Sequence, residues 1–182
     1  MKCAWVYDTN ELMQAYHDYE WGKPTHDERM LFELLSLELM QAGLSWQTII
    51  DKRQALCEAF FNFEIKKVAR ITDQQLEELM KNSKIIRNRK KIRAIINNAQ
   101  VLVKLHAKKQ SLNDLLWQYV DYQPIINHYT KPTQVPSQTQ LSKKIATDLK
   151  KMGFKFVGPT IIYSFLQASG IVNDHLDGCP CK

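Results

Sequence analysis

The 182-residue sequence predicts a single all-α domain. Three observations support this prediction. Apolar residues recur at three- and four-residue steps over long stretches, residues that favour helix N-caps precede those stretches, and no strand-like alternation extends beyond a few residues. No internal repeat, low-complexity tract or interdomain linker interrupts residues 1–182, so we expect one domain.

The first long helices are bounded by recognisable start and stop residues. Thr25 and Glu28 have the spacing of a capping box, and the helix that they open runs to about Ala42 and ends at Gly43. Ser45 is placed to cap the helix that follows. The turn between these two helices is therefore expected to be short.

The rest of the chain continues in the same way after a further capping box at residues 72–75. Three prolines make residues 122–136 the best candidate for a long loop. Proline suits the first position of a helix and glycine the position after its end. Helices are predicted over residues 88–108, from 111–114 onward, from Ser137 to Gly153, and from Gly158-Pro159 to Gly170.

The composition indicates a soluble protein with a preference for polyanions. The net charge is +6 and the pI is about 9.1, which weakly favours a nucleic-acid partner. No apolar run approaches the roughly 20 residues that cross a bilayer. The first residues lack the apolar core of a signal peptide. We therefore expect a cytoplasmic protein without a membrane partner.

Glu38 occupies an unusual position for a carboxylate. It lies three and four residues from Leu35 and Leu34, on the apolar stripe of its helix, and should point inward. Burial of a carboxylate without partners costs several kcal/mol. Glu38 could cap a neighbouring helix or pair with an arginine in the core. Alternatively, it could line a cavity and accept hydrogen bonds from a ligand.

Aromatic residues surround Glu38 in the sequence. Tyr16 and Trp21 precede it, and Trp46 follows the tight turn at Gly43. Aromatic faces and one carboxylate suit a flat cationic ring, through stacking, cation–π attraction and charge. The same aromatic residues could equally be core packing.

A basic segment lies at residues 84–93, where six cationic side chains surround a turn that opens a helix. The N–H groups at a helix N-terminus attract phosphate, and the lysines and arginines add sequence-independent affinity for DNA. A solvated helix face is the alternative interpretation of this segment.

The cysteines and histidines near the two ends of the chain suggest a metal site. His175 and Cys179 are four residues apart, which is workable for half of a zinc site, and Cys3 and His17 could supply the other half. Cys181 competes with Cys179 for this role. Cys57, at a core position of its helix, is expected to be simply buried.

Several motifs, in order from Cys3 to Cys179, together resemble the bacterial 3-methyladenine DNA glycosylase I family. The resemblance implies a helix-hairpin-helix glycosylase fold, with the hairpin near residues 82–91 gripping the DNA backbone. It also implies a structural Zn²⁺ that joins the two termini and takes no part in the chemistry. The motifs are residues 16–22, 37–38 with 41–46, 85–92, 153–158 and 173–175, and the implied zinc ligands are Cys3, His17, His175 and Cys179.

The resemblance further implies that the protein flips 3-methyladenine out of double-stranded DNA and releases it by hydrolysis, without lyase activity. Glu38 would be the catalytic residue, bonding the purine edge as a selector of a base that is already a good leaving group. Trp46 would stack on the base, while Leu44 would fill the gap left in the duplex. The remaining implied contacts are Trp5, Tyr16, Trp21 and Ser164 with the base, and Gln41, Gly43, Lys84, Arg87, Arg89 and Lys90 with DNA.

The sequence departs from the family pattern at two positions. Met13 stands where the family commonly has tyrosine, and Lys84 where the hairpin often has glycine. Residues 153–160 contain no acid in a position to support water attack. We expect a monomer that also binds free 3-methyladenine as its product. A non-catalytic DNA-binding adaptor and a zinc hydrolase are the alternative functions.

Overall fold

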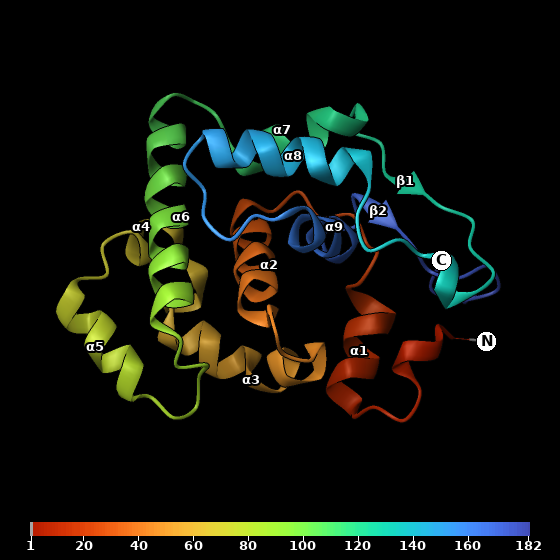
Figure 1. Ribbon diagram of the computed structural model, residues 1–182, viewed down its shortest axis with the longest axis horizontal. Helices are drawn as coiled ribbons and strands as arrows, with labels where there is room; N and C mark the ends of the chain where they lie inside the picture. Colours follow the sequence, from red (N-terminus) through yellow and green to blue (C-terminus); the bar gives the residue numbers. More distant parts are fainter. Residues whose placement is uncertain (1) are drawn as a thin grey trace.

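The computed structural model describes residues 2–182 and confirms the mostly helical fold. The longer helices are connected by short turns, apart from the stretch between α7 and α8 (Figure 1). The α-helices are α1 (Glu11–Tyr19), α2 (Glu28–Gln41), α3 (Trp46–Ala59), α4 (Ile65–Val68), α5 (Asp73–Lys81), α6 (Arg89–Ala107), α7 (Leu112–Trp117), α8 (Gln140–Lys151) and α9 (Pro159–Ala168). Short 3₁₀ turns are η1 (Ala4–Val6), η2 (Phe61–Phe63), η3 (Gln118–Val120) and η4 (Pro132–Gln134).

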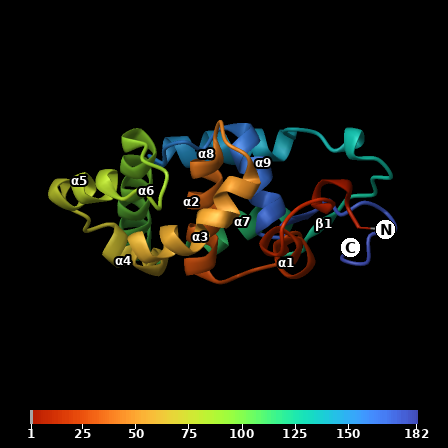
Figure 2. The same cartoon turned by 90° about the horizontal axis from the view of Figure 1, so that it is seen from below.

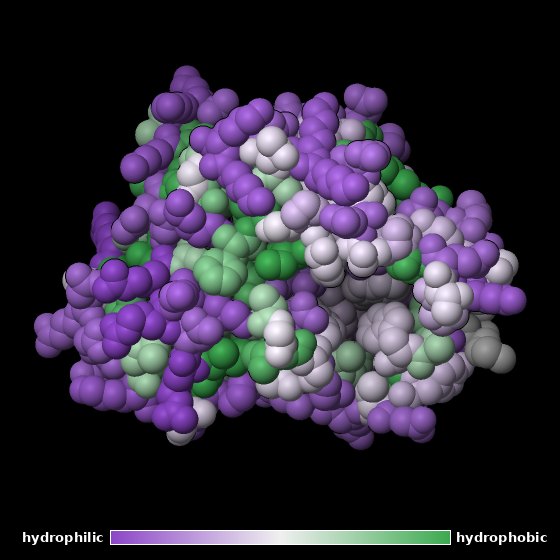
Figure 3. Space-filling model, viewed as in Figure 1, coloured by the Kyte–Doolittle hydropathy of each residue, from purple (hydrophilic) through white to green (hydrophobic). Residues whose placement is uncertain are grey.

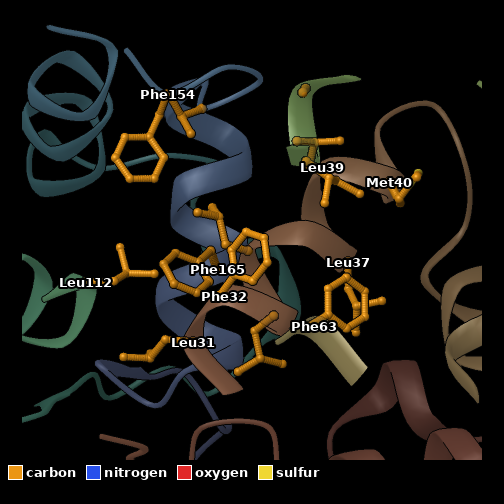
Figure 4. Packing of buried hydrophobic residues seen from close by; sticks show 14 of the residues in the cluster. Leu31, Phe32, Leu37, Leu39, Met40, Phe63, Leu112, Phe154 and Phe165 are labelled. Carbon is orange, nitrogen blue, oxygen red and sulfur yellow. The ribbon is translucent and has the colours of Figure 1, made fainter. Parts of the chain in front are cut away.

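Helix α2 is the centre of the fold, with α3, α6, α7 and α9 packed around it (Figures 1 and 2). Every side chain from residue 31 to residue 40 is buried, so α2 is enclosed on all sides rather than along one stripe. Phe32 of α2 lies against Phe165 of α9 in the core (Figure 4). A carboxylate anywhere on this stretch of α2 therefore needs a partner or a cavity.

The predicted helix starts are correct at some caps and wrong at others. Ser45 accepts a hydrogen bond from the Thr48 N–H at 3.2 Å, and the capping box at residues 72–75 is present. Helix α2, however, begins after Asp27, whose side chain accepts from the Met30 N–H at 2.6 Å, and not at Thr25. Helix α8 likewise has Thr139 as its N-cap instead of Ser137. In both cases two residues that can cap a helix lie close together, and the later one is used.

Two very short strands lie outside the all-helical prediction. β1 (Ile125–Ile126) lies inside the predicted long loop and pairs in parallel with β2 (Val172–Asn173), which follows α9. Two residues are too few for an alternating pattern to be visible in the sequence. This pairing fixes the loop of residues 127–139 beside the C-terminal segment. No helix in the described residues is long and apolar enough to cross a membrane.

Candidate functional site

A cavity of about 470 Å³ opens among α1, the end of α2, the start of α3, and α9. The hollow on the face shown in Figure 3 lies in this part of the molecule. The structure brings together around it all six residues that the sequence assigned to base recognition: Trp5, Tyr16, Trp21, Glu38, Trp46 and Ser164. Gln41, assigned to DNA, also lies in the cavity wall.

Glu38 is buried in the cavity wall without a partner. Its side chain is 4% exposed, and no hydrogen bond or ion pair involves its carboxyl group within residues 2–182. Burial raises the pKa of Glu38 to about 8, because the charged form loses its hydration. The structure therefore excludes a helix cap or an arginine pair as the reason for its inward position. The carboxyl group is left available to a molecule in the cavity.

The other buried carboxylates near Glu38 have partners. Glu33, on the same helix, accepts from Arg29 at 2.6 Å and from Arg53 at 2.7 Å. Asp174 also lines the cavity, but hydrogen bonds from Tyr163, Gln167 and Asn127 hold its oxygens. Glu38 differs from both because no donor within the described part of the chain reaches its carboxyl group. This difference makes Glu38 the candidate binding group of the cavity.

Aromatic rings form much of the cavity wall. The ring centroids of Tyr16 and Trp46 are 5.3 Å apart and tilted by 53°. Trp5 meets Trp21 edge-to-face at 5.1 Å. Burial and the charge of Glu38 raise the pKa of the Tyr16 hydroxyl well above its usual value of 10, so this phenol stays neutral. The wall offers π-faces beside one carboxyl group, an arrangement that suits a planar cation.

The turn between α2 and α3 lies at the edge of the cavity. Gly43 adopts φ = +79°, a conformation that favours glycine. The Leu44 N–H donates to the Gln41 carbonyl at 2.6 Å, and the Gln41 amide donates back to the Leu44 carbonyl at 3.3 Å. The Leu44 side chain is 39% exposed at the tip of this tightened turn. A leucine held outward in this way can act as an apolar wedge.

The basic hairpin carries fewer free cations than its sequence suggests. Arg89 forms a two-armed ion pair with Glu77, and Arg93 lies 3.3 Å from Asp73. Lys91 is buried. The side chains of the other three cations, Lys84, Arg87 and Lys90, are exposed, and none of them forms an ion pair within residues 2–182.

A second pair of helices also forms a hairpin. Helices α8 and α9 pack against each other, and residues 152–158 connect them. Gly158 is the N-cap of α9 and supplies no side-chain cap, so the first N–H groups of this helix remain available. The exposed apolar side chains of this connection are Met152 and Phe156, and Lys155 between them is exposed as well. The sequence assigned the DNA grip to residues 82–91, and residues 153–158 entered only as one motif of the family resemblance, without a DNA-binding role.

The cysteine and histidine residues from the two ends of the chain meet at one buried cluster, as expected. One donor atom each from Cys3, His17, His175 and Cys179 lies within 4.8 Å of all the others. The sulfur–nitrogen distances are 3.4 Å from Cys3 to His175, and 3.5 and 3.7 Å from Cys179 to His175 and His17. Tetrahedral metal bonds of about 2.0 to 2.3 Å place ligands roughly 3.3 to 3.8 Å apart, so the four residues fit a metal ion.

Neighbouring groups orient the two imidazoles for this role. His17 Nδ1 lies 2.8 Å from Asp18, which leaves Nε2 directed at Cys179. His175 Nε2 lies 2.9 Å from the Trp21 carbonyl, which leaves Nδ1 for the cluster. Such second contacts are typical of histidine ligands. Cys181 groups with His17 and Asp18, and its sulfur lies 3.6 Å from Asp18, but it is not a member of the buried four-donor set, which Cys179 completes.

The chain matches a family model described as methyladenine glycosylase over residues 5–182. The chain belongs to the methyladenine glycosylase family. The DNA-3-methyladenine glycosylase of Haemophilus influenzae is 42% identical over 181 residues, which cover 100% of this chain and 97% of that protein. A crystal structure of 3-methyladenine DNA glycosylase I superposes with a TM-score of 0.97 at 45% identity, covering 100% of this chain and 99% of the other. A Y16F variant of 3-methyladenine DNA glycosylase I in complex with 3-methyladenine superposes with a TM-score of 0.95 at 39% identity, with coverages of 100% and 97%.

The two departures from the family pattern are accommodated by the fold of this methyladenine glycosylase. Met13 is buried beside Tyr16 and places a thioether, not a hydroxyl, in the cavity wall. Lys84 does not adopt a positive φ, and its N–H donates to the Asn82 side chain at 3.0 Å. The hairpin turn therefore has no need of glycine at this position.

Sequence reasoning missed part of the cavity wall of this family member. Pro132 and Val135 reach the cavity from the loop that follows β1, where irregular backbone gives no periodic signal. Asp174 could have been noticed as the neighbour of His175. The other lining residues not singled out are Ala4, Thr9, Gln47, Gln167 and Leu176.

Proposed function

We propose that the protein is a DNA glycosylase that removes 3-methyladenine from alkylated DNA by hydrolysing the N-glycosidic bond, leaving an abasic site. The partnerless carboxyl group of Glu38 in an aromatic cavity is the observation that carries this proposal. Adenine alkylated at N3 is cationic in DNA. The cavity offers such a base cation–π contacts of roughly 0.5 to 2 kcal/mol each, together with one carboxylate.

The positive charge of the alkylated base would let the site discriminate it from undamaged adenine. An undamaged adenine can stack on the aromatic faces but carries no positive charge, so it gains no cation–π attraction and cannot repay the ionisation of Glu38 in its buried site. A cationic base pairs with the carboxylate and makes the ionised form favourable. Because alkylation also makes the base a good leaving group, the site needs to bind and orient it more than to activate it.

Access to the base requires its extrusion from the duplex, which costs a few kcal/mol. Leu44, at the exposed tip of its turn, would fill the space that the base vacates. Lys84, Arg87 and Lys90 would hold the backbone, with Gln41 and Gly43 at the turn beside it. Arg89 would need to exchange Glu77 for phosphate to contribute.

Water is the proposed nucleophile. A lyase mechanism needs an amine in the cavity. The cavity wall that residues 2–182 form includes no lysine, which favours a monofunctional enzyme. The oxygens of Asp174 are engaged by three donors, so that residue is already committed to its neighbours.

The direct test is incubation of the protein with methylated duplex DNA and chromatography of the released bases. We expect release of 3-methyladenine with little 7-methylguanine, and none of either from undamaged DNA. A DNA-binding adaptor would retain the duplex without releasing any base, and that result would refute the proposal.

We also propose that the four-donor cluster holds a structural Zn²⁺. The thiolates and imidazoles suit zinc, and all four residues are buried, so a bound ion would have no open position for substrate. A bound zinc ion would cross-link the two ends of the chain and would take no part in base excision. The cluster also supports the cavity, because Trp21 packs edge-to-face on His175 at 4.6 Å and Trp5 on His17 at 5.1 Å.

Chelation is therefore expected to destabilise the protein before it affects chemistry. Removal of zinc should lower the melting temperature by several degrees, and excision should fall only as far as the folded fraction does. Calorimetry and a base-release assay on the same chelated sample check this. A zinc hydrolase would instead lose activity with its melting temperature unchanged.

A further inference from the structure

Lys91 is a buried cation whose partners all belong to another helix. It lies in the first turn of α6, directly after the exposed cations of the hairpin, yet it is only 6% exposed. Its Nζ donates to the Met40 carbonyl at 2.8 Å and to the Ala42 carbonyl at 2.6 Å. No carboxylate within residues 2–182 pairs with it.

These two carbonyls belong to the end of α2. The last carbonyls of a helix lack partners within the helix and carry the negative end of its dipole, so an ammonium group is favoured there. Ala42 leaves the helical conformation at φ = −46° and ψ = 113°, and the Gly43 turn follows. Lys91 thus fixes the point at which α2 gives way to the turn that carries Leu44.

The contact joins two parts of the molecule that face DNA in the proposed function. On one side are the exposed cations of the hairpin that form no ion pair within residues 2–182. Lys91 directly follows the last of them, Lys90, in the sequence. On the other side is the turn between α2 and α3 that carries Leu44. It lies between Glu38 on α2 and Trp46 at the start of α3. A second hydrogen bond also joins α3 to the hairpin, from the Lys52 side chain to the Lys84 carbonyl. This bond is exposed to solvent and is therefore weaker than the buried contacts of Lys91.

We propose that Lys91 is a positioning residue that couples the hairpin's hold on the DNA backbone to insertion of Leu44, so that the bound duplex is driven to extrude its base. This rests on the proposed glycosylase function. Lys91 itself touches neither base nor phosphate. Its role is to hold the turn that carries Leu44 in a fixed position relative to the hairpin while the duplex is distorted.

The test compares substrates that do and do not require extrusion, using Lys91→Met. On methylated duplex DNA we expect kcat to fall about 10- to 100-fold with KM within about threefold, because charged hydrogen bonds to the turn are lost while the exposed cations remain. On methylated single-stranded DNA, and in calorimetric binding of free 3-methyladenine, we expect values within about twofold of the parent protein.

Two further variants make the comparison decisive. Lys104→Met removes a charge from the far end of α6 and should leave every value unchanged. Lys91→Gln keeps one neutral donor, should lose less duplex activity, and carries the comparison if the methionine variant does not fold. Equal losses on duplex and single strands, or no loss on either, would overturn the coupling. Failure of the proposed function is distinct, because the parent protein would then release no base at all.

Discussion

Glu38→Gln is expected to make the protein more stable at alkaline pH and much less active. Burial without a donor raises the pKa of Glu38 to about 8 in the folded protein, against an ordinary value of 4.5. A carboxyl group whose folded pKa is raised contributes stability that is fully present below about pH 4.5. That contribution disappears as the pH rises through about 8. Glutamine carries no charge, so the variant avoids this loss.

The expected size of the effect is large. At pH 9 the variant should exceed the parent in free energy of unfolding by on the order of 2 to 4 kcal/mol, and at pH 4.5 the two should be nearly equal. Excision of 3-methyladenine should fall about 10- to 100-fold, because a charged partner of the base is lost. Urea unfolding at the two pH values and a single-turnover release assay measure both quantities.

Glu33→Gln is the matched control on the same helix. Glu33 is 3% exposed and bonds to Arg29 and Arg53, so its charge is compensated. Its neutralisation removes the ion pairs with Arg29 and Arg53, of which Arg53 keeps only its pair with Glu20, and should destabilise the protein. A Glu38→Gln variant that is less stable than the parent at pH 9, or that excises at the parental rate, would contradict the account of this residue.

Gly170→Ala is expected to have the largest effect on folding. Gly170 follows α9 at φ = +69°, and a Cβ placed there would lie 2.1 Å from the Lys23 carbonyl carbon and 2.3 Å from the Pro24 nitrogen. The neighbouring backbone is held there by hydrogen bonds from the Gly22 N–H to the Gln167 carbonyl and from the Thr25 N–H to the Ser169 carbonyl. Backbone cannot move aside as a flexible side chain can, so we expect a loss of roughly 3 to 5 kcal/mol.

Gly153→Ala separates backbone strain from the clash. Gly153 also has a positive φ, but a Cβ there would meet only Val101 at an ordinary 3.5 Å. This variant should lose about 1 kcal/mol, the approximate cost of a left-handed L-residue. Urea unfolding of the two variants gives both values. Equal losses would mean that the close approach of residues 23–24 to Gly170 does not constrain the fold.

The sequence was informative where structure is local and periodic. Helical spacing and caps such as Ser45 and Thr72 predicted most of the helices. The periodicity that placed Leu34 and Leu35 inward also placed Glu38 inward, and the structure agrees. The choice between Asp27 and Thr25 as N-cap lay beyond this reasoning, because both side chains can accept from the helix N-terminus and only packing decides between them.

Non-local contacts were out of reach of the sequence. Arg53 reaches Glu33 across 20 residues and leaves Glu38 alone, a distinction that helical spacing cannot make. The two-residue strands and the cavity wall at Pro132 and Val135 depend on a long loop without periodicity. Lys91 appeared in the sequence as one more exposed cation of the hairpin. Its burial depends on where α2 ends.

The central claim is that a partnerless, ionisable Glu38 selects the cationic base. The most direct measurement is the pH dependence of kcat/KM for 3-methyladenine release from methylated duplex DNA, for the parent and for Glu38→Gln. Because kcat/KM reports ionisations of the free enzyme, the parent should rise with pH through a limb near 8. That limb should be absent in the variant. The same limb in both proteins, or none in the parent, would contradict the claim.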